Sequence, residues 1–595
     1  MKFTTTPIIR QDGILKRMFR VAFLTTCVIE LSQVGASLID GIITSRFLGI
    51  DEMAAIGIAL PYFSIAGVIS GCISVGMQTM CTREAGRGKI ENMNRIFSAA
   101  VTTGALLALL ITLVFLLFAS PIAALFGAKG DAGNLLDLTG TYLTGLAIGT
   151  PAMILNAILS PAAQLDNGSK AVRNASIIIA VTDIAGDLLA VKLRMGMFGI
   201  GLATSLSSLA GFFVLAANFV RKDSIIRFRF TLPDRHCMKE MTALGIEKLV
   251  RRTVNIFRPI LLNTLVIAAG GNLAMSVMSI RNSVNNFIEI PGAGIAGAVA
   301  VLSGIFYGEV NEDDIQKTAC IAHRYSFICA LCSTLLVVLL AKPLAVFYLG
   351  KDNEGIPLLV FAFVCLGIRS VFSNLTTARV SYLQALHKIV PAQILSILLN
   401  LVCITFSAAI LGRLFGTYGI MAAFPVSEFL VMIMIYGYYA IREKRVLPSR
   451  EDYMSLDRSF HIGPGDVIDL PISGPEDAAL TSAQIALFCK GHGFDTRRAF
   501  FAGLCAEETA RNIIEQEFEK DEKPHSVDIR VVLRGDDLIL RFRDNCPSYN
   551  MIKQAKMIRD NADPAANAGI RIIQKTAKDI SYYRTMETNT TIITI

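Results

Sequence analysis

The chain has 595 residues, of which 53% are apolar and only 17% are charged. This composition is too apolar for a soluble protein of this length, so the sequence predicts a multi-pass membrane protein. Of the net charge of +8, residues 1–445 carry 37 Lys and Arg against 25 Asp and Glu, whereas residues 446–595 carry 19 against 23. The basic excess lies in the apolar part, which argues against nucleic acid as a partner and for the lipid bilayer.

Residues 21–47 form the first apolar stretch that is long enough to cross a bilayer. Polar residues interrupt it at steps of three and four, which places them on one face of a helix. They are Glu30, Gln33, Ser37, Asp40 and Thr44. A carboxylate inside a membrane span is costly unless it faces water, a partner or a ligand. The stripe therefore predicts a cavity, with Glu30, Gln33 and Ser37 along its wall.

Similar apolar segments of about 20 residues recur along the first three quarters of the chain and predict an all-α polytopic fold. We expect twelve spans, at about 19–44, 54–80, 96–119, 136–160, 171–192, 197–220, 246–270, 275–306, 322–342, 356–378, 389–411 and 417–441. Counted from an inner N-terminus, about 27 Lys and Arg fall on the inner side and about 7 on the outer side. This bias predicts that both termini lie in the cytoplasm.

The spans repeat at an offset of 220–222 residues. The matched pairs include Gly86 with Gly308, Pro121 with Pro343, and Gln164 with Gln384. Two six-helix lobes, residues 1–222 and 223–445, are therefore expected. An even number of spans in each half makes the repeats parallel, which is typical of carriers that bind a substrate between two rocking halves.

The fifth span carries Asp183 and Asp187, one helical turn apart. Two carboxylates at that spacing cannot both ionise cheaply in a low dielectric, so one takes a proton or a cation lies between them. We expect Asp40 to join them and the three acids to couple movement of H⁺ or Na⁺. The alternative is that Asp187 lies near the outer end of its span and only contacts the interface.

The second half offers a different polar set for a substrate cavity. Its members are Asn255, Arg258, Arg281, Asn285 and Glu289. Either arginine could pair with Glu289, and a purely structural salt bridge is the alternative. Arg369 is interpreted as weak cavity lining, and Glu428 as a lone acid.

No phosphate-binding loop of the Gly-x-x-x-x-Gly-Lys-Ser/Thr type occurs, so transport driven by that kind of ATPase is not expected. The twelve Cys show no metal-ligand spacing. Transport therefore requires no cofactor in this interpretation, and an ion gradient would supply the energy.

After residue 445 the composition changes. Residues 446–469 are expected to form a linker, and residues 470–595 a cytoplasmic α/β domain. Residues 527–533 and 538–544 alternate like a hairpin around a Gly-Asp-Asp turn, and residues 551–560 and 569–578 look helical.

Residues 38–49 (Leu-Ile-Asp-Gly-Ile-Ile-Thr-Ser-Arg-Phe-Leu-Gly) and 83–89 (Arg-Glu-Ala-Gly-Arg-Gly-Lys), together with the duplication, resemble the MATE (multidrug and toxic compound extrusion) transporters. The resemblance covers about residues 15–442. It implies a prokaryotic plasma-membrane antiporter that exports organic cations for H⁺ or Na⁺, with Asp40 as the first-helix acid. Asp183 stands where the family has Asn, which leaves the coupling ion open.

The C-terminal domain resembles the GHKL-type ATP-binding fold of anti-sigma serine kinases. Residues 508–512 (Glu-Thr-Ala-Arg-Asn) resemble the box in which Asn512 would hold Mg²⁺ and Glu508 would act as base. Residues 544–547 (Asp-Asn-Cys-Pro) resemble the box in which Asp544 reads adenine, and Gly569 resembles the end of the lid. Other glycines typical of the lid are absent, so a nucleotide-free docking or dimerising domain is the alternative.

Taken together, these features predict a transporter rather than an enzyme, regulated by a kinase-like domain that could contact a cytoplasmic protein. One alternative is a related flippase for a lipid-linked sugar. The other is a membrane-tethered sensor kinase that uses the helical part as a receptor.

Overall fold

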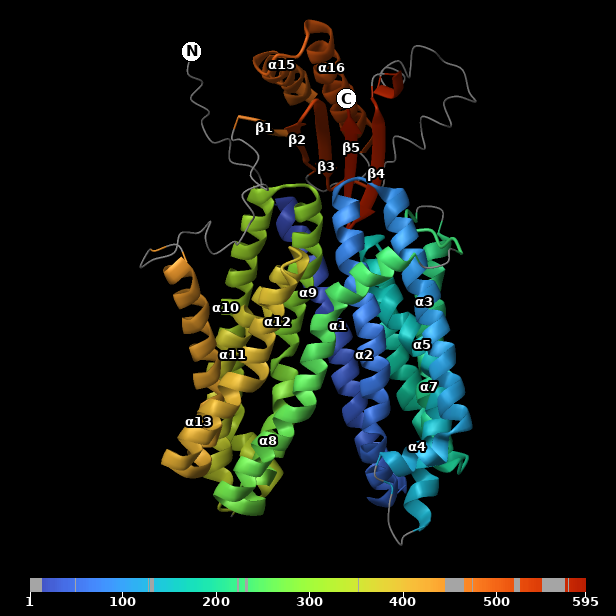
Figure 1. The fold of residues 1–595 in the computed structure, drawn as a ribbon, viewed down its shortest axis with the longest axis vertical. Helices are drawn as coiled ribbons and strands as arrows, with labels where there is room; N and C mark the ends of the chain where they lie inside the picture. The colour runs from blue at the N-terminus through green and yellow to red at the C-terminus, as the bar shows by residue number, and fades with distance from the viewer. Residues whose placement is uncertain are drawn as a thin grey trace.

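The computed structural model describes residues 13–48, 50–126, 128, 133–221, 224–230, 234–351, 353–442, 444, 465–472, 475–517, 525–547, 573–575 and 577–595. These residues form a tall helical bundle with a small sheet-and-helix tail on one end (Figure 1). The bundle consists of two lobes side by side. We call the end that carries the tail the tail side.

The first lobe contains the helices of the N-terminal half. They are α1 (Gly13–Ile43) with the π-helical extension η1 (Thr44–Leu48), α2 (Ile50–Gly86), α3 (Ile90–Leu117), α4 (Ala119–Leu125), α5 (Gly133–Leu165), α6 (Ser169–Lys192) and α7 (Gly196–Val220). Large apolar side chains remain exposed on the outside of this lobe, among them Leu117 at 65% and Phe213 at 66%. Such an outer surface suits helices whose solvent is lipid.

The second lobe contains the helices of the following half. They are α8 (Arg235–Ile288), α9 (Ile290–Gly308), α10 (Glu312–Leu349), α11 (Ile356–Ala385), α12 (Ile389–Ile397), the π-helical segment η2 (Leu398–Val402) and α13 (Cys403–Arg442). Two of these helices contain a break at glycine. Gly271 (φ 59°, ψ −148°) interrupts α8, and Gly416 (φ 60°, ψ −139°) interrupts α13. Only glycine adopts such a backbone without strain.

Ten of the described helical segments are long and apolar enough to cross a membrane. The last of them, Ile389–Tyr438, has 50 residues and contains the break at Gly416. The apolar segment Phe257–Gly271 of α8 is shorter than the others. The expected count of twelve spans therefore stays a prediction.

One apolar core joins the two lobes. Buried residues of α1 and α2, such as Phe19 and Met77, belong to the same cluster as Leu302 and Phe306 of α9. A second cluster lies inside the second lobe, between α8, α10, α11 and α13. The lobes therefore meet along α1, α2, α8 and α9, which the contacts of α1 with α9 and of α2 with α8 also show.

The tail is a five-stranded antiparallel sheet with two helices. Its elements are β1 (Val467–Ile472), α15 (Pro475–Gly491), α16 (Thr496–Glu517), β2 (Val527–Arg534), β3 (Asp537–Asp544), β4 (Asp579–Thr585) and β5 (Thr588–Thr594), with the strand order β1-β2-β3-β5-β4. The predicted hairpin is confirmed, because Leu533 pairs with Leu538 across a turn in which Gly535 has a φ of +61°. Strand β1 begins at Val467, inside the stretch assigned to the linker.

The two faces of the sheet differ in chemistry. Leu540 and Phe542 of β3 pack with α15 and α16 into the core of the tail. Successive strand residues point to opposite faces, so Arg541 and Arg543 lie on the other face. Figure 1 shows that the helices cover the side away from the bundle, so the arginine face is turned toward the lobes.

Candidate functional site

Three carboxyl groups come together inside the first lobe. Asp40 lies near the end of α1, while Asp183 and Asp187 lie one turn apart on α6. Asp40, Asp183 and Asp187 are close enough to interact electrostatically with one another. Asp183 also accepts a hydrogen bond of 3.3 Å from the hydroxyl of Ser207 on α7. The structure thus brings together the three acids that the sequence singled out.

The surroundings of these acids are closed and aromatic. Tyr142 of α5 is 4% exposed and lies within electrostatic range of all three carboxyls. Tyr62 of α2 donates a hydrogen bond of 3.0 Å to the carbonyl oxygen of Leu146 and lies 2.8 Å from the hydroxyl of Thr150. Because Asp183 and Asp187 are buried, charge placed there is poorly solvated.

Several oxygen atoms in this region lack a partner within the described part of the chain. They are Oδ1 of Asp40, Oδ1 of Asp187 and the hydroxyl of Thr44. Buried oxygens of this kind are costly unless a proton or a cation satisfies them. Over the described ranges, however, no three His, Cys, Asp or Glu side chains are arranged to hold a metal ion together.

A second polar site is a cavity of about 480 Å³ between the lobes. Its charged lining comes from both lobes and consists of Glu30 on α1, Arg258 and Glu289 from the α8 region, Arg369 on α11 and Glu428 on α13. Uncharged polar residues complete the wall, among them Gln78, Thr79, Ser373, Asn374, Thr377, Gln384 and Asn400. Three acids against two guanidiniums give this interlobe cavity a formal charge of −1.

Arg369 organises the charges of the interlobe cavity. Its Nη1 atom lies 2.9 Å from Oε1 of Glu289 and 2.7 Å from Oδ1 of Asn285, and its Nε atom lies 3.3 Å from Oε1 of Glu428. Glu428 also accepts a hydrogen bond of 3.1 Å from Thr376. The expected pairing of Glu289 with Arg258 or Arg281 is therefore corrected, because the ion-pair partner of Glu289 is Arg369.

Some residues expected in the cavity lie elsewhere. Arg281 is 2% exposed, lies 3.6 Å above the ring of Phe424 and donates to Asn282, so it is a packed residue of the second lobe. Gln33 and Ser37 are exposed on α1 and do not line the interlobe cavity. The side chain of Asn255 lies outside the described residues.

Three of the expected nucleotide residues, Glu508, Asn512 and Asp544, are described. Glu508 and Asn512 stand one turn apart on α16, where the amide of Asn512 donates 2.7 Å to the carbonyl oxygen of Glu508. Asp544 ends β3, and its Oδ1 atom accepts hydrogen bonds from Asn589 (2.7 Å) and from the backbone of Cys546 (3.0 Å). Gly569 and most of the two helices expected after residue 550 lie outside the described residues.

Sequence reasoning undervalued Arg369 and Glu428 and missed Tyr142. A usable signal existed for the first two: each is the one charged residue in an otherwise apolar span, and a buried charge needs an opposite charge. No comparable signal marks Tyr142, because a tyrosine in an apolar helix is compatible with ordinary packing.

Comparisons with known proteins address the bundle. A model of the family described as MatE matches the chain twice, over residues 26–189 and 254–407, which together exceed half of its length. The multidrug export protein MepA of Staphylococcus aureus (strain bovine RF122 / ET3-1) is 25% identical over 420 residues, covering 67% of this chain and 90% of that protein.

Solved structures share the fold of the bundle. A structure described as the outward-facing conformation of a multidrug resistance MATE family transporter of the MOP superfamily gives a TM-score of 0.67 at 20% identity, over 72% of this chain and 95% of that one. A MOP superfamily transporter from Pyrococcus furiosus, described as having a binding pocket of reverse polarity, gives 0.65 at 20% identity with the same coverage. The family match ends at residue 407, so it does not include the tail.

Proposed function

The chain belongs to the MATE family and is a multi-pass membrane transporter rather than an enzyme, and from this premise we propose that it exports organic cations in exchange for protons. The two lobes would alternate access to the interlobe cavity, as parallel repeats in such carriers do. The MepA relatives are multidrug export proteins, and we extend this activity to the present chain as part of the proposal.

The observation that supports the proton assignment is the closeness of Asp40 and Asp187, whose carboxyl groups interact electrostatically. Two carboxyl groups this close cannot both ionise cheaply in a low dielectric, so one of them takes a proton or a cation lies between them. Asp183 adds a third acid to the same space, so binding and release of a proton there changes a strongly repulsive arrangement. Na⁺ is the other candidate, because unpartnered oxygens of Asp40, Asp187 and Thr44 are also available.

The interlobe cavity supports the choice of an organic cation. Its volume of about 480 Å³ is in the range that holds a drug-sized molecule. Glu289 and Glu428 pair with Arg369, while the first lobe contributes Glu30 to the cavity wall and the second lobe contributes Arg258. The formal excess of one negative charge favours a positively charged guest over an anionic lipid-linked sugar.

We further propose that the tail side faces the cytoplasm of a prokaryotic plasma membrane. The helix connections on this side carry Arg83, Arg87 and Lys89, in keeping with the excess of positive charge on the inner face of membrane proteins.

For the tail, we propose that it is a regulatory domain that binds Mg-ATP. Asp544 suits the recognition of an adenine amine, because Asn589 and the amide of Cys546 hold its carboxylate in a fixed position. The hydrogen bond to Glu508 uses the side-chain nitrogen of Asn512. The side-chain oxygen of Asn512 would be a ligand of Mg²⁺. Binding of Mg-ATP to the tail would be the event that regulates transport. Exposed Leu480, Leu487 and Phe500 on α15 and α16 offer a face for a cytoplasmic protein.

Accumulation of ethidium, a fluorescent organic cation, in cells that express the full chain tests the export proposal. Asp40→Asn should abolish the difference from cells without the protein, while Asp137→Asn, which changes an exposed carboxylate on α5, should export normally. Equal export by the two variants would refute the role of Asp40. Competition by a lipid-linked sugar but not by ethidium would favour the flippase instead.

Binding of a fluorescent ATP analogue to the full chain tests the nucleotide proposal. Asp544→Asn and Asn512→Ala should each weaken Mg-dependent binding by at least about tenfold, since each removes a hydrogen bond or ligand that no neighbour replaces. Absence of binding to the unmodified chain would remove this part of the proposal.

A further inference from the structure

The two lobes touch closely on the tail side. Gly86, the last residue of α2, and Gly308, the last residue of α9, occupy matching positions of the internal repeat. A Cβ atom added at Gly86 would lie 2.1 Å from the carbonyl oxygen of Ile305, and one added at Gly308 would lie 2.1 Å from that of Arg83. The contact is thus reciprocal, as a pseudo-twofold axis requires, and it has no room for a side chain.

Further close contacts between the lobes lie in the same half of the bundle. An added Cβ atom at Gly76 of α2 would lie 2.1 Å from the carbonyl oxygen of Met241 on α8, and one at Gly297 of α9 would lie 2.6 Å from the hydroxyl of Thr26 on α1. The ribbons of α2 and α8 diverge toward the opposite end (Figure 1). The structure is therefore closed on the tail side.

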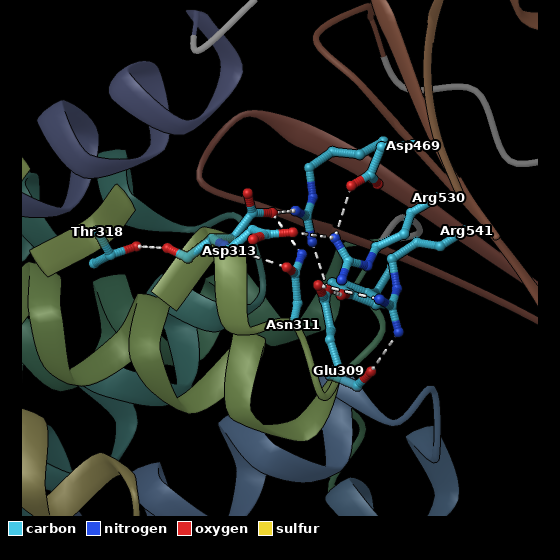
Figure 2. A network of polar contacts seen from close by, with 11 residues as sticks. Glu309, Asn311, Asp313, Thr318, Asp469, Arg530 and Arg541 are labelled. Atoms are coloured by element: carbon cyan, nitrogen blue, oxygen red, sulfur yellow. Dashed lines mark hydrogen bonds and ion pairs between the residues drawn. The ribbon is translucent and has the colours of Figure 1, made fainter. Parts of the chain in front are cut away.

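The tail contacts the second lobe through a buried group of charges. Arg541 and Arg543 of β3 and Tyr583 of β4 converge on Glu309, the residue that follows α9. Figure 2 shows Arg541 beside Glu309. Arg541 lies 3.4 Å from Oε2 of Glu309, and the hydroxyl of Tyr583 donates 3.0 Å to Oε1. Arg543 pairs with Glu309 and also lies 3.4 Å from Asp314.

The ion pairs of Arg541 and Arg543 with Glu309 form only while the tail lies against the second lobe. The side chain of Glu309 is fully buried, and those of Arg541 and Arg543 are 6% exposed. Burial alone would lower the pKa of Arg543, but the neighbouring Glu309, Tyr583 and Asp314 raise that pKa above its ordinary value. Removing one partner from such a group leaves an unpaired buried charge, which strongly disfavours the docked arrangement.

The tail contacts the first lobe through the turn between β4 and β5. Met586 and Glu587 form this turn with φ values of +49° and +64°, which non-glycine residues rarely adopt. Met586 is completely buried and belongs to the apolar core of the bundle. The backbone N–H of Glu587 donates a hydrogen bond of 2.7 Å to Oδ1 of Asn167. The carboxylate of Glu587 lies 3.0 Å from Arg17.

One side chain reaches both lobes. The Nη2 atom of Arg541 donates 3.4 Å to the carbonyl oxygen of Gly86 in the first lobe, while its Nη1 atom faces Glu309 in the second lobe. We propose that the tail is a clasp that holds the two lobes together on the tail side, and that it must be released before the interlobe cavity opens there. This inference rests on the proposed alternation of access between the lobes.

Distance measurements on the full chain in lipid nanodiscs test the clasp. Spin labels on noncanonical residues at Val220, at the end of α7, and Val390, at the start of α12, report the separation of the lobes on the tail side. Both positions are exposed, by 84% and 63%, and this labelling leaves the native thiols in place. Glu309→Gln and, independently, Met586→Ala should raise the fraction of molecules with a long distance by at least about fivefold, a typical coupling between linked sites.

Asp537→Asn is the matched control. It removes a carboxylate at the start of β3 that pairs with exposed Lys578 of the tail, so the distance distribution should stay that of the unmodified chain. Hydrogen exchange in β2 and β3 would verify that the tail remains folded in every variant. Unchanged distances in both Glu309→Gln and Met586→Ala would overturn the clasp. The measurement uses no substrate, so a failure of the export proposal would show itself separately, as a lack of ethidium export by the unmodified chain.

Discussion

The Nε atom of Arg369 lies 3.3 Å from Oε1 of Glu428, so a guanidinium on α11 connects a glutamate on α13 with Glu289 after α8. Arg369 and Glu428 are both nearly inaccessible to solvent. The group therefore fixes the wall of the interlobe cavity contributed by the second lobe. It also explains how three charges persist inside a membrane helix bundle, since each has an opposite charge within reach.

Replacement of Arg369 by Met should destabilise the protein by about 3–5 kcal/mol, because two carboxylates would lose their buried partner. The triple variant Arg369→Met, Glu289→Gln, Glu428→Gln should recover most of this loss, since no unpaired charge then remains. Thermal unfolding in detergent would measure both. A single variant as stable as the unmodified protein would contradict the assigned role of Arg369.

Replacement of Gly308 by Ala should separate the lobes on the tail side. The new methyl group would meet the backbone of Arg83, which cannot move away as a flexible side chain can. Overpacking of this kind costs about 1–3 kcal/mol, and here it destabilises the arrangement in which the two lobes touch on the tail side. The distance between labels at Val220 and Val390 should lengthen.

Gly57→Ala provides the comparison for that experiment. Gly57 lies in α2, whereas Gly308 lies in α9, and an added Cβ atom at Gly57 has no neighbour within 4 Å. The methyl group should leave the distance unchanged and, if anything, favour the helix by up to about 1 kcal/mol. A lengthened distance in Gly57→Ala as well would mean that the effect does not come from the contact between the lobes.

The free energy of unfolding of the tail should fall as the pH rises from about 4 to about 6, because Asp544 in the folded tail holds a proton in this interval. Burial raises the pKa of Asp544 from 3.8 to about 6, although hydrogen bonds from Asn589 and Cys546 partly oppose the rise. Between these two pH values the folded state keeps a proton on Asp544 that the unfolded chain releases. The stability contributed by this proton is fully present below pH 4 and is lost as the pH rises to about 6 and above. A shift of this size corresponds to up to about a hundredfold in the folding equilibrium.

Hydrogen exchange of β3 and β5 amides in the full chain, corrected for the intrinsic rates, would measure this dependence. Asp544→Asn cannot titrate and should remove the part of the pH dependence that lies between pH 4 and 6. Identical pH profiles for the variant and the unmodified chain would show that Asp544 does not hold a proton in this interval.

The spacing of polar residues on α1 predicted one stripe along the helix, but spacing cannot say which neighbours each member meets. In the structure the polar residues of α1 belong to two different sites. Glu30 lines the interlobe cavity, and Asp40 lies near Asp187 within the first lobe. The MATE resemblance, which used order and duplication of motifs rather than single residues, is confirmed by the family match. The GHKL resemblance of the tail stays a prediction.

The docking of the tail was not predicted, although the pattern of β3 was. Alternation of Leu540 and Phe542 with Arg541 and Arg543 predicts a strand with one apolar and one polar face, and the polar face of an isolated domain is expected in water. The missing information was its partner, Glu309. A signal did exist, because the repeat-related segments differ in charge: residues 81–92 carry three Arg and Lys against two Glu, whereas residues 303–314 carry four acids and no Arg or Lys.

We propose that a proton held by the cluster of Asp40, Asp183 and Asp187 drives export. Ethidium efflux from proteoliposomes can be measured under an imposed pH gradient and, separately, under an imposed sodium gradient. Efflux should follow the pH gradient, should not respond to the sodium gradient, and should disappear in Asp187→Asn. Efflux that follows sodium alone, or that persists undiminished in Asp187→Asn under the pH gradient, would contradict it.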